Sequence, residues 1–359
     1  MAEAHGPPPA GEVDGPPPAG EVDGPPPAGE VDPWASFRSG FVSVVGRPNV
    51  GKSTLVNRIL GTKVTITSPR PNTTRRSVRG VLHRPGLQAV LVDTPGLHKP
   101  RSTLGERLND HVAEALDEVD VAVAVLDATM ALGPGDRLVL QRAATSVAEG
   151  PPGVPDRLWR LLVVVNKVDV ASPAAVLRQL AAAASTVAAA GVPGAAAVGP
   201  EGAQAAAGAG GAREPSDPGV EYFPVSAVTG AGVDAVVEAV LARLPAGPPY
   251  FPADAVTDVP EAFWVAELVR EQLLAVAREE LPHAIACRVT EWEWPRVRVE
   301  ILVERESQKA MVIGRGGRVL KEVGTSVRRQ LPPGAYLELH VTVERRWQMR
   351  PDRIDQLGY

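Results

Sequence analysis

The sequence predicts an α/β chain of two domains, in which a mainly parallel sheet flanked by helices is followed by a smaller α+β domain. In the first part, short apolar runs alternate with helical stretches, an order typical of parallel sheets covered by helices. After a proline-rich segment at 245–252, the order becomes α-β-β-α-α-β. The chain has 359 residues and is 44% apolar, which is enough to build two packed cores.

The domain boundaries follow from changes in composition. Residues 6–32 are three identical copies of Gly-Pro-Pro-Pro-Ala-Gly-Glu-Val-Asp with almost nothing to bury, so residues 1–36 are expected to form a disordered tail. Between 181 and 218 the chain is almost pure Ala, Gly and Pro. The first part of this segment can extend a helix, and the rest predicts a loop insertion. The other expected units are a first domain at 37–245, a linker at 246–259 and a second domain at 260–359.

Strands and helices of the first domain are expected from short apolar runs and from helical periodicity, respectively. The expected strands cover 41–45, 77–83, 87–93, 121–127, 158–166 and 222–225, and the expected helices cover 53–60, 104–116 and 233–244. The second domain begins with a long amphipathic stretch and contains a glycine turn between two helices. Its expected elements are a helix at 260–280, strands at 284–292 and 297–303, a short helix, the turn at 314–317, a helix at 318–331 and a strand at 336–343.

Composition narrows the functional classes. The single cysteine, Cys287, cannot form an internal disulfide, and the six histidines lack metal-ligand spacing, so both suit a reducing cytosol. The N-terminus lacks the basic and apolar regions of a signal peptide, and no apolar run approaches the roughly 20 residues that cross a bilayer. A soluble, cytoplasmic protein is therefore expected. The net charge of −5 taken alone argues against a nucleic-acid partner, but it is an average over the whole chain and can hide a local basic face.

A glycine-rich loop follows the first expected strand. Residues 46–53 fit G-x-x-x-x-G-K-[ST] between a strand and a helix, which is the context that a phosphate-binding loop (P-loop) requires. Its amides and the helix dipole favour phosphate, Lys52 is expected to bridge the β- and γ-phosphates, and Ser53 to ligate Mg²⁺. A plain glycine-rich turn is the alternative. The predicted nucleotide-binding residues of this loop are Gly46, Arg47, Pro48, Asn49, Val50, Gly51, Lys52, Ser53 and Thr54.

Three later segments at strand ends complete a nucleotide site. Asp93 is placed to hold a magnesium-bound water and Gly96 to offer its amide to the γ-phosphate, although Asp-x-Pro-Gly is also an ordinary turn. The carboxylate of Asp169 can accept the N1 and amino protons of guanine, which selects GTP over ATP. Ser226-Ala227 is expected to place a backbone amide near guanine O6. The residues predicted to bind nucleotide here are Asp93, Thr94, Pro95, Gly96, Asn166, Lys167, Asp169, Ser226 and Ala227.

The polar segment 71–75, Pro-Asn-Thr-Thr-Arg, lies between the phosphate-binding loop and Asp93. Thr74, or Thr73 in its place, can reach Mg²⁺ when a γ-phosphate is present, so the segment would become ordered with GTP and relax with GDP. A solvated connector is the alternative. The predicted metal ligands are Ser53 and Thr74, and the predicted catalytic residues are Lys52, Thr74, Asp93 and Gly96.

The second domain carries a candidate RNA site. Its G-x-x-G turn lies between two helices, and residues 305–329 hold seven basic and two acidic side chains. A turn without side chains lets a sugar-phosphate backbone approach the amides, as in KH modules that grip about four nucleotides. The alternative is a plain turn with solvated arginines, and for Trp292, Trp294 and Trp347 core packing is favoured over base stacking. The predicted RNA-binding residues are Gly314, Arg315, Gly316, Gly317, Arg318 and Lys321.

These motifs, in this order, resemble those of the Era family of bacterial ribosome-assembly GTPases over about residues 41–359. The resemblance implies a P-loop GTPase domain followed by a type II KH domain, a monomer that binds GTP, GDP and Mg²⁺, and binding to the 3′ end of 16S ribosomal RNA on the 30S subunit. It also implies peripheral inner-membrane association in some members. The matching segments are 46–53, 72–75, 93–100, 166–169, 226–227, Pro-Pro-Tyr-Phe-Pro at 248–252, Arg-Glu-Glu-Leu-Pro at 278–282, the turn at 314–317, Trp347 and 357–359.

The resemblance also bears on turnover. In related GTPases an Asn at the position of Asn49 helps to hold a monovalent cation, which implies K⁺ stimulation. Leu97 stands where Ras-type enzymes carry a glutamine that positions water, so slow intrinsic GTP hydrolysis is expected. Two other functions stay open at this point: an RNA chaperone for which GTP is only structural, and a signalling GTPase with a protein target.

Overall fold

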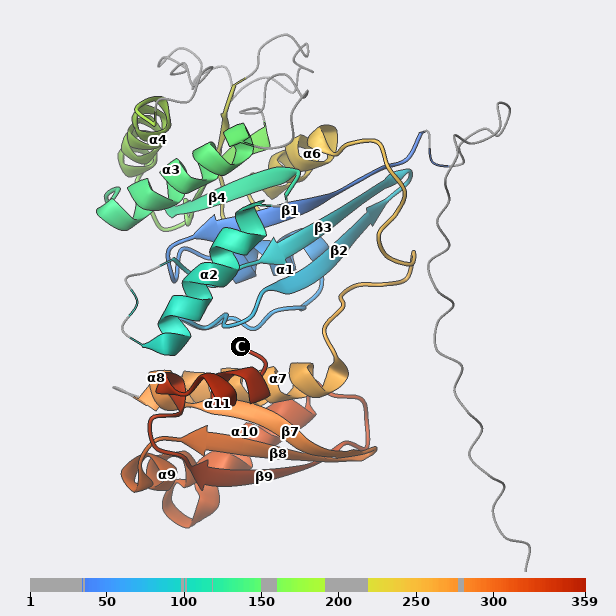
Figure 1. Cartoon of the computed structure of the whole chain (residues 1–359), viewed down its shortest axis with the longest axis vertical. Helices are drawn as coiled ribbons and strands as arrows, with labels where there is room; N and C mark the ends of the chain where they lie inside the picture. The colour runs from blue at the N-terminus through green and yellow to red at the C-terminus, as the bar shows by residue number, and fades with distance from the viewer. Residues whose placement is uncertain are drawn as a thin grey trace, which may run out of the picture.

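The computed structural model describes residues 34, 36–97, 100, 102–117, 119–149, 160–190, 219–276 and 281–359. Figure 1 shows two layered domains, one above the other, joined by an extended connection. Residues 1–33 and 35 of the predicted tail at 1–36, and residues 191–218 of the predicted insertion, lie outside the described residues.

The first domain is built on a six-stranded sheet with the strand order β2-β3-β1-β4-β5-β6. Every neighbouring pair is parallel except β2 and β3, which form an antiparallel hairpin. The carboxyl ends of the parallel strands therefore meet at one edge, where open α/β sheets bind ligands. The strands are β1 (Arg38–Gly46), β2 (Val78–Arg84), β3 (Leu87–Asp93), β4 (Val121–Asp127), β5 (Leu161–Asn166) and β6 (Glu221–Pro224).

Helices cover both faces of this sheet because the strands are apolar on both sides, as buried parallel strands are. Neighbouring residues of β1 show the division: Val44 packs in one core cluster and Val45 in the other. On the Val44 side lie α1 (Lys52–Leu60) and α6 (Val233–Arg243), and on the Val45 side lie α2 (Thr103–Asp117), α3 (Pro134–Glu149) and α4 (Pro173–Ala188).

The second domain has a three-stranded sheet in the order β7-β8-β9, antiparallel between β7 and β8 and parallel between β8 and β9. One face packs against α7, α9 and α10 through residues such as Leu268, Val299 and Val323. The elements are α7 (Glu261–Val276), α8 (Leu281–Ala284), β7 (Ala286–Glu293), β8 (Arg296–Val303), α9 (Glu306–Ile313), a 3-10 turn (Arg315–Gly317), α10 (Arg318–Arg328), β9 (Tyr336–Val343), a second 3-10 turn (Trp347–Met349) and α11 (Pro351–Gln356).

The expected elements agree with this structure apart from three helices. The strands predicted at 87–93 and 121–127 coincide with β3 and β4, and the α-β-β-α-α-β order of the second domain is confirmed. Helices α3, α8 and α11 were missed. Helix α3 opens with Pro134-Gly135, a turn signal, and two of its buried residues are alanines, which leave little amphipathic pattern. The expectation that the first part of the segment 181–218 extends a helix is confirmed, because residues 181–188 continue α4 and Ala183 and Val187 are buried.

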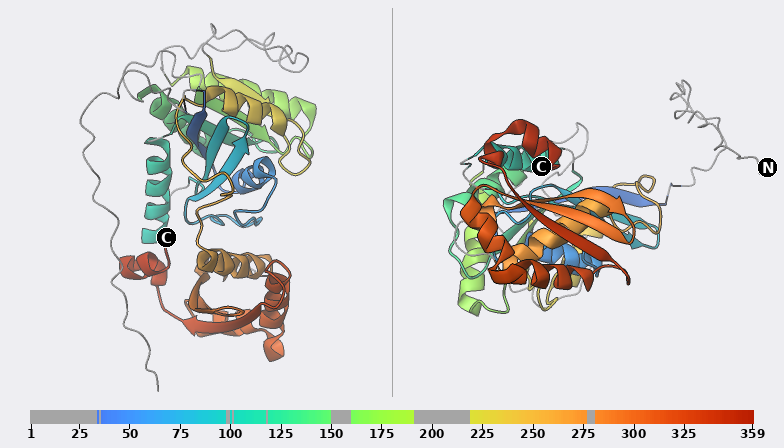
Figure 2. Two further views of the ribbon diagram at one scale, coloured as in Figure 1. Left: turned by 90° about the vertical axis from the view of Figure 1, so that its right-hand side faces the viewer. Right: turned by 90° about the horizontal axis from the view of Figure 1, so that it is seen from below.

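A small apolar cluster joins the two domains. Leu104 and Leu108 of α2 pack with Trp347, Ile354 and Leu357 of the C-terminal segment. Figure 2 shows this segment at the foot of α2. The Trp347 indole is fully buried, and its N–H donates to the Ala284 carbonyl at 2.9 Å. The expectation that this tryptophan serves packing is confirmed. None of the helices among the described residues combines the length and the apolar character needed to span a bilayer.

Replacing Trp347 by alanine should destabilise the second domain by about 3–5 kcal/mol, because it leaves a cavity between the domains. Trp294→Ala is the matched control, since the Trp294 side chain is 47% exposed, and it should change the free energy of unfolding by under about 1 kcal/mol. Denaturant titrations followed by far-ultraviolet circular dichroism measure both. Equal effects of the two variants would contradict the anchoring role of Trp347.

Candidate functional site

The phosphate-binding loop connects β1 to the N-terminus of α1 with an unusual backbone. Asn49 and Gly51 have φ angles of 66° and 100°, a region that favours Gly and tolerates Asn. A Cβ atom on Gly51 would lie 2.2 Å from Asn166 Nδ2. Any other residue at position 51 would therefore push the loop away from β5, so the motif glycine is needed for both conformation and space.

Lys52 is buried beneath this loop. Its Nζ donates to the carbonyl oxygens of Gly46 at 3.1 Å and Arg47 at 3.0 Å. Burial lowers the pKa of Lys52 to about 8, while the charge of Asp93 opposes that shift. Two of the three ammonium hydrogens are thus held by the protein, which leaves the third for a phosphate oxygen.

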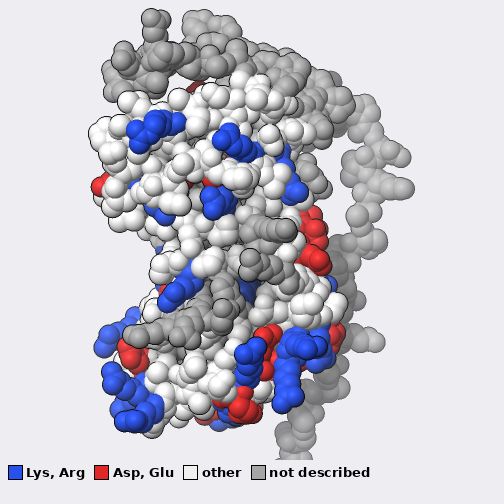
Figure 3. Space-filling view, turned by 90° about the vertical axis from the view of Figure 1, so that its left-hand side faces the viewer, with Lys and Arg blue, Asp and Glu red and all other residues white. Residues whose placement is uncertain are grey.

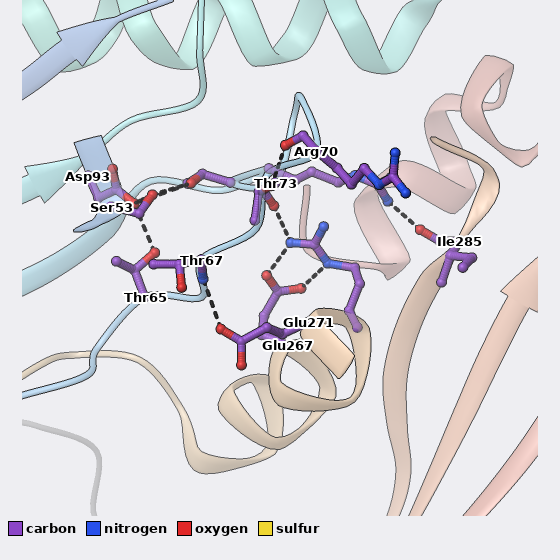
Figure 4. Close-up of polar contacts among 12 residues, drawn as sticks. Ser53, Thr65, Thr67, Arg70, Thr73, Asp93, Glu267, Glu271 and Ile285 are labelled. Carbon is purple, nitrogen blue, oxygen red and sulfur yellow. Dashed lines mark hydrogen bonds and ion pairs between the residues drawn. The ribbon is translucent and has the colours of Figure 1, made fainter. Parts of the chain in front are cut away.

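Three hydroxyl groups surround the Asp93 carboxylate at the tip of β3. Asp93 Oδ2 accepts hydrogen bonds from Ser53 at 2.7 Å, Thr65 at 2.8 Å and Thr74 at 3.2 Å. The hydroxyls of Ser53 and Thr74 lie 3.0 Å apart. Figure 4 shows Ser53 and Thr65 converging on Asp93. The structure therefore brings together the residues predicted to ligate Mg²⁺, and it adds Thr65, which the sequence analysis missed.

This cluster fits a magnesium ion. Hydroxyl and carboxylate oxygens are the ligands that Mg²⁺ takes beside nucleotide phosphates. Asp93 Oδ1 is buried and has no hydrogen-bond partner among the described residues, so it can accept a hydrogen bond from a metal-bound water. Burial raises the pKa of Asp93, against the lowering effects of Lys52 and the three hydroxyls. A nearby cation would favour the ionised carboxylate.

The Asp-Thr-Pro-Gly segment lies directly against the phosphate-binding loop. A Cβ atom on Gly96 would come within 2.5 Å of the Pro48 nitrogen, and the Leu97 amide donates to the Gly46 carbonyl at 3.2 Å. Thr94 anchors the segment through a 2.8 Å hydrogen bond to the Val44 carbonyl. The Leu97 side chain is buried in the core, so it is turned away from any position that could orient water.

Asn166, at the end of β5, ties the nucleotide motifs together. Its Nδ2 donates to the Val50 carbonyl at 2.8 Å, and its Oδ1 accepts from the Ala227 amide at 2.9 Å. A guanine O6 would have to compete with Asn166 for that amide, so the predicted contact of Ala227 with the base stays a prediction. The neighbouring Asp169 is exposed, as a base-binding carboxylate must be.

Two further residues shape the guanine pocket without belonging to a motif. Asp127, at the end of β4, forms a 2.6 Å ion pair with Lys167 and so fixes the direction of that side chain. Arg58 of α1 donates to the carbonyls of Ala227 and Val228, which holds the loop after β6. Neither residue was predicted from the sequence. The position of Asp127 at the end of an apolar strand was the only signal for it, and Arg58 had none.

The glycine turn of the second domain lies on the surface between α9 and α10. Gly314, Gly316 and Gly317 have φ angles of 72°, 61° and 76°, a range that glycine favours. Gly316 and Gly317 adopt the left-handed conformation, whereas Gly314 has an extended ψ of 168°. The side chains of Arg315, Arg318 and Lys321 are exposed around it. Figure 3 shows Lys and Arg gathered at the lower end of the molecule, over this domain, with acidic residues between them. The six residues predicted to bind RNA therefore lie together.

Comparisons with known proteins agree with this arrangement. A family model described as 50S ribosome-binding GTPase matches residues 41–167, and a KH domain model matches residues 280–348. GTPase Era of Mycobacterium avium (strain 104) is 41% identical over 335 residues, which cover 90% of this chain and 99% of the relative. GTPase Era of Mycobacterium tuberculosis (strain ATCC 25618 / H37Rv) gives the same identity and coverage.

Two crystal structures extend the similarity to three dimensions. One is Era in complex with MgGDPNP and nucleotides 1506–1542 of 16S ribosomal RNA, at 33% identity and a TM-score of 0.73. The other is an Aquifex aeolicus Era variant bound to GDP.AlF4⁻, at 32% identity and the same TM-score. Each comparison covers 90% of this chain and 99% of the matched chain.

Asn166→Ala should weaken GDP binding by about 10- to 100-fold, because it removes both hydrogen bonds that hold Val50 and Ala227 in register. Gln88→Ala is the matched control: Gln88 is an equally buried amide that bonds Tyr250 and Phe251, on β3 and away from the site. Titrations with a fluorescent GDP analogue measure the affinity. An unchanged affinity in Asn166→Ala, or an equal loss in Gln88→Ala, would show that Asn166 does not organise the pocket.

Proposed function

The chain belongs to the Era family of GTPases, and from this membership we propose that it is a GTP-dependent switch that binds the 3′ end of 16S ribosomal RNA during assembly of the small ribosomal subunit. The observation that carries the proposal is the presence, on one chain, of a complete guanine-nucleotide site and an exposed basic glycine turn. The RNA itself is taken from the related Era complex, which contains nucleotides 1506–1542 of 16S ribosomal RNA.

GTP hydrolysis proceeds by in-line attack of water on the γ-phosphate, and the chain positions the groups that stabilise the transition state. The Lys52 ammonium, held by two loop carbonyls, is directed at the phosphates. The amides at the start of α1 and at Gly96 surround the same oxygens. Bound Mg²⁺, held by Ser53 and Thr74, would neutralise phosphate charge. Because Leu97 is buried, no side chain at its position orients the water, so intrinsic turnover is expected to be slow.

Guanine is selected at the ends of β5 and β6. The exposed Asp169 carboxylate accepts the N1 and amino protons of the base, a donor pair that adenine lacks. The Lys167 stem, fixed by Asp127, lies beside the base plane. The P-loop and the loop after β6, joined through Asn166, close the pocket around them.

A single RNA strand would follow the glycine turn. The backbone amides at the start of α10 and the exposed side chains of Arg315, Arg318 and Lys321 offer donors to its phosphates. Gly314 cannot carry a side chain, because a Cβ atom there would lie 2.6 Å from Val319. Single-stranded ends are the usual targets of KH modules, since their bases are free to enter a groove.

The first test compares RNA affinity between nucleotide states. A short single-stranded RNA matching the 16S 3′ end should bind more tightly when a non-hydrolysable GTP analogue is bound than when GDP is bound, and fluorescence anisotropy measures the difference. Asp169→Asn should remove the effect of guanine nucleotides by weakening their binding. Equal affinity in both states would favour an RNA chaperone, and no RNA binding would favour a signalling GTPase with a protein target.

Gly316→Asp should weaken RNA binding about tenfold or more, because it places a negative charge in the turn. Nothing lies within 4 Å of a Cβ built on Gly316, whose φ is 61°. Gly334→Asp is the matched control, since Gly334 also has open space and a positive φ of 92° but lies in the loop before β9. If both variants bind RNA like the unchanged protein, the turn is not the RNA site.

A monovalent cation is expected to assist turnover. The Asn49 Nδ2 donates to the Pro69 carbonyl at 2.8 Å. The side-chain oxygen of Asn49 and that carbonyl oxygen would be the protein ligands of a cation bound beside the phosphates. Replacing K⁺ by Na⁺ at constant ionic strength should therefore slow GTP hydrolysis, and Asn49→Ala should remove the difference. Equal rates in both salts would contradict this part of the proposal.

Three further expectations accompany this proposal: a cytoplasmic location, which the composition favours, a monomeric state, and peripheral membrane association, which the family resemblance implies for some members. Light scattering measures the oligomeric state. Co-sedimentation with vesicles of anionic phospholipid, at low and high salt, measures membrane binding, and protein that stays in the supernatant at low salt would contradict it.

A further inference from the structure

The loop between α1 and β2, residues 61–77, is held from both sides. Toward the nucleotide site, the hydroxyls of Thr65 and Thr74 donate to Asp93. Toward the KH domain, the same loop meets α7 and the residue before β7 (Figure 4). The loop that supplies Thr65 and Thr74 to the candidate magnesium site is therefore also in contact with the second domain.

Several contacts with the second domain hold this loop, among them an ion pair between Lys63 and Glu271, and three of the hydrogen bonds lie along residues 67–75. The Thr67 amide donates to Glu271 Oε1 at 2.9 Å, and the Arg75 guanidinium donates to the Ile285 carbonyl at 2.7 Å. Between them, the Arg270 guanidinium donates to the Thr73 carbonyl. The last contact lies one peptide bond from Thr74, the residue whose hydroxyl faces Ser53 and Asp93.

Arg270 is built to hold a fixed position. Its side chain is fully buried, and both its Nε and one terminal nitrogen donate to Glu267 one helical turn earlier. Burial opposes the charge of Arg270, but the Glu267 carboxylate more than offsets this effect and raises the pKa. A charged guanidinium that a carboxylate holds along one edge, through Nε and Nη2, has little rotational freedom left. The guanidinium can therefore donate its hydrogen bond to the Thr73 carbonyl in one orientation only.

The peptide bond transmits this constraint to Thr74. The Thr73 carbonyl and the Thr74 amide lie in one rigid plane, so a bond that fixes the carbonyl also fixes the orientation of the Thr74 backbone. The Arg75 side chain, with its guanidinium carbon 5.4 Å from the ring centres of Trp347 and Tyr359, holds the other side of Thr74. Thr74 is thus held between two arginine contacts with the KH domain.

We propose that Arg270 of the KH domain is a positioning residue for GTP hydrolysis, which acts by orienting Thr74 toward the magnesium site through the Thr73 carbonyl. The inference rests on the proposed GTPase mechanism and extends it to a residue outside the nucleotide-binding domain. Because Thr74 is needed only when a γ-phosphate is present, Arg270 should affect turnover and leave GDP binding intact. Replacing a residue that only joins the domains would not lower turnover while leaving GDP binding intact.

A second interdomain ion pair, away from the loop at 61–77, offers a control for loosening of the interface. Arg107 of α2 forms an ion pair with Asp355 of α11, also between domains, but contacts no part of the loop at 61–77 in the described structure. Arg107→Met and Arg270→Met each remove one interdomain guanidinium and keep an unbranched side chain. Only Arg270→Met removes a contact next to Thr74.

The experiment measures steady-state GTP hydrolysis, its Mg²⁺ dependence and GDP affinity for the unchanged protein, Arg270→Met, Arg270→Lys and Arg107→Met. We expect Arg270→Met to lower kcat on the order of tenfold, to raise the Mg²⁺ concentration for half-maximal turnover, and to leave GDP affinity within about twofold. Arg270→Lys should recover part of kcat, since it restores one donor. Arg107→Met should match the unchanged protein.

Each other outcome decides against the inference. Unchanged kcat and Mg²⁺ dependence in Arg270→Met, or an equal loss in Arg107→Met, would overturn it. If Arg270→Met does not fold, Arg270→Lys serves in its place, since it keeps the charge but loses the planar guanidinium, and an unchanged kcat and Mg²⁺ dependence in that variant would overturn the inference equally. Absence of GTP hydrolysis in the unchanged protein would contradict the proposed function itself, which is a different result.

Discussion

The buried carboxylate of Asp93 is the constraint around which the molecule is organised. It ends a fully buried strand, so its charge must be compensated from within the protein. Lys52 supplies the opposing charge, and the hydroxyls of Ser53, Thr65 and Thr74 supply hydrogen bonds. Two of these hydroxyls come from the loop between α1 and β2, which is therefore drawn into the site. The outer side of that loop becomes the surface on which α7 packs.

The contact between the domains is accordingly polar where it touches the loop and apolar beside it. Arg75, Glu267 and Arg270 are buried together at the loop, whereas Leu104, Leu108 and Trp347 form the neighbouring apolar cluster. A buried charge that loses its partner is strongly destabilising. Opening this contact would break several hydrogen bonds to buried charged groups at once. A site that gains or loses a γ-phosphate at Thr74 can in this way alter the state of the domain that carries the proposed RNA-binding turn.

Much of this arrangement was predictable from the sequence because it depends on local patterns. Apolar runs gave β3 and β4 their bounds, and the motif spacing brought Lys52, Asp93 and Asn166 to one edge of the sheet. The rest depends on contacts between distant residues. Thr65 and Arg270 belong to no motif. Thr65 lies in a connecting loop and Arg270 on an amphipathic helix, so only the packing of α7 against the loop shows what these side chains contact. Helix α3 was missed because its sequence begins as a turn.

The most direct test of this account is amide hydrogen exchange of residues 61–77, followed by mass spectrometry on protein bound to a non-hydrolysable GTP analogue, with and without RNA. The account predicts that RNA bound at the distant glycine turn changes the exchange rates of amides in this loop, because α7 and the nucleotide site share it. If RNA protects the turn between α9 and α10 while exchange in residues 61–77 stays the same, the two sites are independent and the central claim is wrong.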